Sequence, residues 1–297
     1  MVSTDSLASQ QAQSKAQVSS RASALPWWLW WNILSADAPT VAAVWAVVFE
    51  RSSSRGISKL TIFALVACVW LIYFADRLLD GWGAEAYLLK ARHRFCDRNS
   101  AAILWLLGAG GAATAWAVWR ELSLREIEAG LVLSAIVGGY LLCVHVGRKS
   151  FARFMPKEIA VGLLFATGTT LPVWSRAAKI SGEMLITWIL FGFVCALNCL
   201  AIECWENDAS RLTGLLRWCD SRFSTIAAAL LAIAVAARIF LTTGIAGPPM
   251  LAIGIAALLM LVLNSMRDRL SRPALRVLAD AALVVAACVA MLRQWGI

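Results

Sequence analysis

The sequence predicts an all-α protein that crosses a membrane several times, with nine transmembrane helices. Of its 297 residues, 60% are hydrophobic and 15% are charged, and the mean hydropathy is +0.71. Soluble proteins carry about 25% charged residues, so this composition argues against a soluble globule or a disordered chain. The net charge of +9 fits the excess of Lys and Arg in cytoplasmic loops of membrane proteins, and we expect no nucleic-acid partner.

The first 25 residues differ from the rest of the chain. They are rich in Ser, Gln and Ala, and no apolar stretch precedes Trp27. Such a segment cannot bury enough apolar surface to fold, and it lacks the apolar region of a signal peptide. We therefore expect residues 1–25 to be a disordered cytoplasmic tail and residues 26–297 to be one transmembrane domain.

Nine apolar segments follow this tail. In lipid every backbone polar group needs an internal partner, so each segment is expected to be a helix. The expected helices cover residues 26–49, 59–79, 99–119, 127–146, 158–174, 184–202, 223–243, 249–264 and 275–294.

The distribution of Lys and Arg predicts the orientation of these helices. The tail and the loops after the second, fourth, sixth and eighth segments together carry 16 basic residues, whereas the opposite side carries 8. Basic residues concentrate in cytoplasmic loops. We therefore expect an integral membrane protein with its N-terminus in the cytoplasm.

Two acidic clusters end the second and sixth segments on this predicted cytoplasmic side. Asp76 and Asp80 are four residues apart and share one helix face, while Glu203 and Glu206 are three apart and Asp208 follows them. Grouped carboxylates near lipid are costly unless something neutralises them. Mg²⁺ suits this role because it binds one or two carboxylates and completes its shell with water and phosphate oxygens.

Basic residues in the neighbouring loops supply the charge that a phosphate needs. Arg favours bidentate phosphate contacts and Lys acts as a point charge. Carboxylates that can bind Mg²⁺, basic side chains that can bind phosphate, and an apolar helical interior together indicate a site for a lipid diphosphate. The candidate basic residues lie in two loops: Lys90, Arg92 and Arg94 in the loop after the second segment, and Arg148, Lys149 and Arg153 in the loop after the fourth.

Three segments carry a resemblance to a known family. ADRLLDG at 75–81 resembles the first aspartate-rich motif of the UbiA superfamily of intramembrane prenyltransferases, and NCLAIECWEND at 198–208 resembles the second. PKEIAVGLLF at 156–165 is similar to the start of the family's fifth helix. Where the family usually has Asn and often Asp ahead of the first motif, this chain has Ile72 and Tyr73.

The resemblance implies a nine-helix UbiA-like bundle, in a bacterial inner membrane, that uses Mg²⁺. It implies transfer of a prenyl group from a polyprenyl diphosphate to a lipophilic, often aromatic, acceptor. The implied catalytic and metal-binding residues are Asp76, Asp80, Glu203, Glu206 and Asp208. The implied substrate-binding residues are Arg77, Lys90, Arg92, Arg94, Arg148, Lys149, Arg153 and Asn198.

Other readings remain open from the residues alone. A membrane terpene cyclase would ionise the same substrate without an acceptor, and a lipid-binding or transport protein would carry polar helix ends without catalysis. Asn198 either orients a ligand or bonds between helices. Asp37, in the middle of the first segment near Pro39, is a candidate functional carboxylate. No role is assigned to Asp280.

Overall fold

The computed structural model describes most of the transmembrane domain. The residues that it describes are 26–53, 56–81, 99–146, 157–177, 179–207, 212, 214–241 and 247–294. The predicted tail at 1–25 and the candidate basic residues of the two loops lie outside these ranges.

The described residues are helical throughout their long segments, as the composition predicts. Eight of the nine predicted segments each form one helix, and most boundaries agree to within a few residues. The exception is the start of the seventh, at Gly214 instead of residue 223. The described residues form ten helices: α2 (Trp27–Ile33), α3 (Asp37–Ser53), α4 (Lys59–Gly81), α6 (Ser100–Glu121), α7 (Leu124–Val146), α9 (Lys157–Trp174), α10 (Gly182–Glu206), α11 (Gly214–Phe240), α12 (Gly247–Ser265) and α13 (Arg272–Gln294).

The helices make this a polytopic membrane protein. Within the described residues, seven helices are long and apolar enough to cross a membrane, or up to eight if α2 and α3 together form one bent span. Helix α9 occupies a predicted segment but is not among these spans. Its 18 residues are about 27 Å long, slightly less than the apolar core of a bilayer. The predicted count of nine spans is thus not confirmed.

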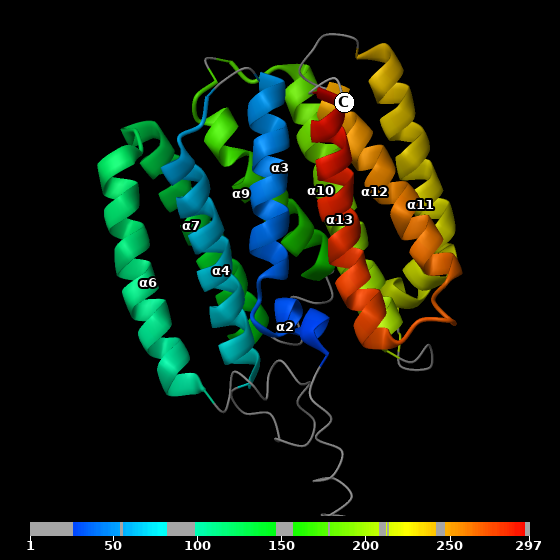
Figure 1. The fold of residues 1–297 in the computed structure, drawn as a ribbon, viewed down its shortest axis with the longest axis horizontal. Helices are drawn as coiled ribbons and strands as arrows, with labels where there is room; N and C mark the ends of the chain where they lie inside the picture. The colour runs from blue at the N-terminus through cyan, green and yellow to red at the C-terminus, as the bar shows by residue number, and fades with distance from the viewer. Residues whose placement is uncertain are drawn as a thin grey trace, which may run out of the picture.

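The prediction of one continuous helix over 26–49 is wrong. The chain bends by 80° between α2 and α3. Ser35 has a φ of 54°, which interrupts the helix, and Pro39 in the first turn of α3 has no N–H to continue it and would clash with the preceding turn. Asp37 therefore begins α3 instead of lying in the middle of a helix. Figure 1 shows α2 near one end of the bundle, which we call the α2 end.

Helix α3 lies at the centre of the bundle (Figure 1). Trp45 on α3 is fully buried, stacks on Phe191 of α10 with 4.3 Å between ring centroids, and donates its indole N–H to the Leu283 carbonyl of α13 at 3.1 Å. Helices α9 and α10 approach very closely at Gly162, where an added Cβ would lie 2.7 Å from the Cα of Ala196. These contacts fix the mutual positions of α3, α9, α10 and α13, which carry most of the buried polar residues.

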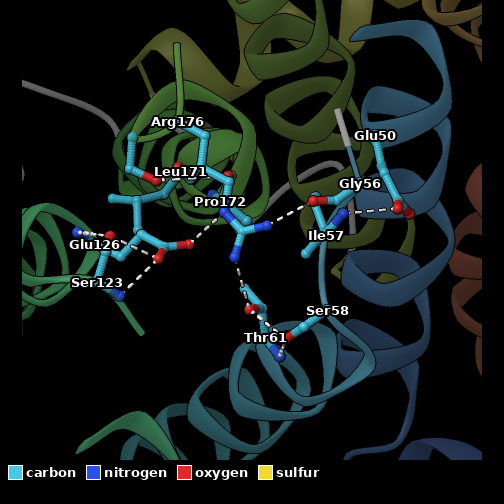
Figure 2. Close-up of polar contacts among 11 residues, drawn as sticks. Glu50, Gly56, Ile57, Ser58, Thr61, Ser123, Glu126, Leu171, Pro172 and Arg176 are labelled. Carbon is cyan, nitrogen blue, oxygen red and sulfur yellow. Dashed lines mark hydrogen bonds and ion pairs between the residues drawn. The ribbon is translucent and has the colours of Figure 1, made fainter. Parts of the chain in front are cut away.

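The end opposite α2 has its own polar cluster, which Figure 2 shows. Arg176, just after α9, donates from Nε to Glu126 Oε1 of α7 at 2.8 Å and from Nη1 to the Gly56 carbonyl at 2.6 Å. Glu126 is 2% exposed and also accepts from the backbone N–H and hydroxyl of Ser123. A single guanidinium thereby ties the α6–α7 turn to the segment between α3 and α4.

Candidate functional site

The end of α4 carries the first predicted acidic motif. Asp76 is partly buried, and Asp80 lies in the last turn of the helix, although its side chain is outside the described part of the structure. The one-turn spacing of these two residues on α4 agrees with the sequence prediction, but their joint contact with a metal remains a prediction.

Arg77, predicted to bind substrate, holds the bend between α2 and α3. It is 4% exposed and donates from Nη1 to the Asn32 carbonyl at 2.6 Å. Nη2 lies 3.6 Å from the Asp37 carboxylate. A cation next to the last carbonyls of a helix also interacts favourably with the helix dipole. The guanidinium is thus engaged in the protein interior, and its predicted contact with substrate stays untested.

Asp37 has partners that explain how a carboxylate is tolerated here. Its Oδ2 accepts from the Asn32 side-chain amide at 2.5 Å, and its Oδ1 accepts from the Ala38 backbone N–H at 3.0 Å. Together with Arg77, these contacts satisfy a side chain that is 3% exposed. The sequence flagged Asp37 as an intramembrane carboxylate but missed its pairing, because the partner lies 40 residues further along the chain.

The end of α10 carries the second acidic motif. Glu206 Oε1 accepts from Arg276 Nη1 of α13 at 2.9 Å, and the Glu206 carbonyl accepts from Arg272 at 3.3 Å. Glu203 accepts from the Asn207 side chain at 3.1 Å and lies 3.9 Å from Lys157 Nζ of α9. Asp208 lies outside the described residues. The described part of this motif is therefore flanked by cations of α9 and α13.

A third group of polar residues lies deeper in the bundle. Asn198 of α10 donates from Nδ2 to Asp280 Oδ1 of α13 at 2.8 Å, which is the interhelical bond, one of its two alternatives. Its contact with substrate stays a prediction. Tyr73, Asn198 and Asp280 each stand eight residues from the α2-end terminus of their helix, about 12 Å along its axis. Sequence reasoning missed Asp280 and Arg276, although charged residues within an apolar segment are themselves a functional signal.

Tyr73 connects the α4 motif with these deeper residues. It lies close enough to Asp76 on its own helix, and to Asp37 and Asp280 on α3 and α13, for electrostatic interaction. We call the assembled residues the polar centre. Its members are Asp37, Tyr73, Asp76, Arg77, Asn198, Glu206, Arg276 and Asp280.

The polar centre combines four carboxyl groups with two guanidiniums. With all four carboxyl groups ionised it would carry a net negative charge, which a bound cation would balance. Within the described residues, His, Cys, Asp and Glu side chains form no group of three or more that could hold a metal ion. Two of the five predicted ligands, Asp208 and the Asp80 side chain, fall outside that description.

The predicted phosphate-binding loops also fall outside the described residues. The structure therefore places neither loop relative to the polar centre. The residues concerned are Lys90, Arg92, Arg94, Arg148, Lys149 and Arg153. A small cavity of about 20 Å³ lies at the opposite end, between Phe49, Thr170 and Met184, and has room for about one water molecule.

The chain was compared with protein-family models, with curated proteins and with solved structures, and no match was found. The function proposed below is therefore supported by the residues and their geometry.

Proposed function

We propose that this protein is a Mg²⁺-dependent intramembrane prenyltransferase, which moves a prenyl group from a polyprenyl diphosphate to a lipophilic, aromatic acceptor. The observation that carries this proposal is the polar centre itself. It brings residues of α4 and α10, the two helices with acidic motifs, to the α2 end of the bundle. A net negative charge on the centre would favour binding of a cation, and the bound cation would in turn attract the anionic diphosphate.

The residues fit hard-cation chemistry. The proposed ligands are all carboxylates, namely Asp76, Asp80, Glu203, Glu206 and Asp208, and oxygen is the donor that Mg²⁺ prefers. When bound, Mg²⁺ would stabilise the negative charge that develops on the departing diphosphate. The proposed loop cations would contact the remaining phosphate oxygens, and the apolar helix faces would accommodate the prenyl chain.

The proposed prenyltransferase also implies an architecture in the membrane. Helices α2 and α3 would form the first span and α9 the fifth, which gives the nine spans of a UbiA-like bundle. The α2 end would face the cytoplasm of a bacterial cell, where Mg²⁺ and diphosphate are present. The short α9 is tolerated because its Gly162 face packs tightly on α10 and needs less lipid-exposed length.

A ligand-induced stability measurement tests this proposal. The full-length protein in detergent should gain thermal stability from farnesyl diphosphate and Mg²⁺ together, because a ligand stabilises the state that it binds. Asp76→Asn should weaken the affinity for Mg²⁺ and diphosphate by at least roughly tenfold, about 1.4 kcal/mol, and should abolish turnover.

Asp220→Asn is the matched control. Asp220 on α11 is a carboxylate 2.9 Å from Arg267 Nη1, and it lies outside the polar centre. This variant should keep the shift. An unchanged shift in Asp76→Asn, or no shift in the wild type at saturating ligand, would contradict the proposal. Release of a cyclised hydrocarbon in the absence of acceptor would identify a terpene cyclase instead.

A further inference from the structure

Helix α2 presents one exposed apolar face. Its sequence, WWLWWNI, contains four tryptophans and no charged residue. Trp27, Trp30 and Leu34 are 84%, 41% and 42% exposed, and their spacing of three and four residues places them on one side of the helix. Asn32 and Ile33, by contrast, are buried against the bundle. The helix therefore has one face that packs on the protein and one face that is open to its surroundings.

Hydrogen bonds to the bundle hold α2 in this orientation. Arg77 Nη1 of α4 donates to the Asn32 carbonyl at 2.6 Å, and the Asn32 side-chain amide donates to Asp37 of α3. Trp70 of α4 donates its indole N–H to the Leu34 carbonyl at 2.9 Å. Because these bonds tie the end of α2 to both neighbouring helices, its exposed face is a fixed feature of the fold.

The length of α3 places α2 at the boundary of the bilayer. Helix α3 has 17 residues, about 26 Å, and ends in the polar residues 50–53, so it spans most of an apolar core of about 30 Å. The chain bends by 80° between the two helices, and Figure 1 shows α2 lying across the end of α3. A helix that lies crosswise at the end of a spanning helix runs along the membrane surface.

The backbone of α2 argues against the apolar core as its surroundings. The first N–H groups of a helix have no partner within it, and Pro26 at the N-cap position forms no side-chain hydrogen bond with them. Such groups are strongly disfavoured in hydrocarbon, whereas large exposed indole rings are disfavoured in water. The boundary between headgroups and acyl chains offers polar partners to the N–H groups and an apolar environment to the rings, and tryptophan is enriched there.

We infer that α2 binds the lipid interface at the α2 end of the bundle, with Trp27, Trp30 and Leu34 immersed between headgroups and acyl chains. This face carries no charge, so its binding requires no anionic lipid. Helix α3 then crosses the apolar core, and α2 is the interfacial start of the first span. Because Arg77 of the first acidic motif holds α2, the lipid contact also sets the depth of the polar centre below the membrane surface.

Depth measurements on individual tryptophans test the inference. The full-length protein is labelled with 5-fluorotryptophan in phosphatidylcholine nanodiscs, and Trp27→Phe and Trp30→Phe each remove one ¹⁹F resonance and thereby assign it. Lipids with a spin label at carbon 5 or carbon 16 of the acyl chain, and a water-soluble gadolinium chelate, then report the surroundings of each ring. We expect the carbon-5 label to broaden both resonances most, because interfacial helices lie about 5–10 Å into the boundary of headgroups and acyl chains.

Trp45 is the matched control. It is a fully buried tryptophan of α3, so the resonance that Trp45→Phe assigns should respond to none of the three reagents. Leu34→Trp adds a ring to the exposed face without removing a native one, and it keeps the test usable if Trp27→Phe or Trp30→Phe does not fold. The added resonance should also be broadened most by the carbon-5 label.

Three results would overturn the inference. Strongest broadening by the chelate would place the exposed face in water, and strongest broadening by the carbon-16 label would place it in the apolar core. Protection from all three reagents, as expected for Trp45, would show that another segment or a second copy of the chain covers the face. The measurement needs neither Mg²⁺ nor diphosphate, so its outcome is independent of the proposed prenyltransferase.

Discussion

Single residues show where charge is placed in an apolar interior. Asp37 and Arg77 are each almost fully buried, on helices α3 and α4, and each would be costly alone. The sequence placed Asp37 in the middle of the first apolar segment and Arg77 in the motif that ends the second. It could not pair them, because a contact between helices depends on their rotation and depth, which local patterns do not specify. Arg77 is engaged with the bend before α3, so its first role in the structure is to hold α2.

This pairing predicts strong coupling between the two residues. Arg77→Met leaves the Asp37 carboxylate buried without its cation and should lower the free energy of unfolding by about 3–5 kcal/mol. In the double variant with Asp37→Asn the loss should be smaller than the sum of the single losses by about 0.5–3 kcal/mol. Reversible unfolding in mixed micelles measures the free energy of unfolding of the two single variants and the double variant.

Arg238→Met, at an exposed residue, is the control and should change stability by about 0.5 kcal/mol or less. If the losses of the two single variants simply add in the double variant, the pairing is refuted.

At the scale of elements, α6 and α7 are the least enclosed helices. In the most apolar stretch of each helix, 17% of the residues are buried in α6 and 6% in α7, against 61% in α10. Figure 2 shows what holds them at the end opposite α2: the contacts of Arg176 with Glu126, Gly56 and Thr61. Because α7 buries little surface of its own, the position of its start should depend strongly on this one side chain.

Removing this tie should loosen α7 locally. Arg176→Gln loses the ion pair with Glu126 and should lower stability by about 1.5–3 kcal/mol, the range for a charge-assisted hydrogen bond. Hydrogen exchange should become faster around Ser123 and at the start of α7, while amides in the middle of α10 stay protected. Lys179→Gln, an exposed residue in the same connection, is the control and should leave exchange unchanged. Equal acceleration in both variants would show that Glu126 does not depend on Arg176.

For the whole molecule, the sequence predicted the all-helical membrane class and the approximate bounds of eight segments. This worked because apolar length and charge content are read directly from composition. It failed at the 26–49 segment, where Ser35 and Pro39 break the helix, and at the start of α11, where Arg217 and Arg222 were assigned to a loop. The polar centre was predicted in part. The sequence identified the acidic motifs of α4 and α10, whereas the roles of Arg276 and Asp280 could be seen only from the packing of α13 on α10.

The orientation in the membrane follows from charge summed over all loops. In the sequence, the tail and the loops predicted on the side of the acidic motifs carry 16 basic residues and those on the opposite side carry 8, so the polar centre should open toward the cytoplasm. Protease sites inserted after Arg269, between α12 and α13, and after Lys179, between α9 and α10, should be cleaved from opposite sides of the membrane. In intact spheroplasts the site after Lys179 should be cut and the site after Arg269 should be protected, and inverted vesicles should give the opposite result.

Cleavage of both sites from one side would contradict the placement of these loops at opposite ends of the bundle. A reversed pattern would turn the polar centre away from cytoplasmic Mg²⁺ and count against the proposed transferase.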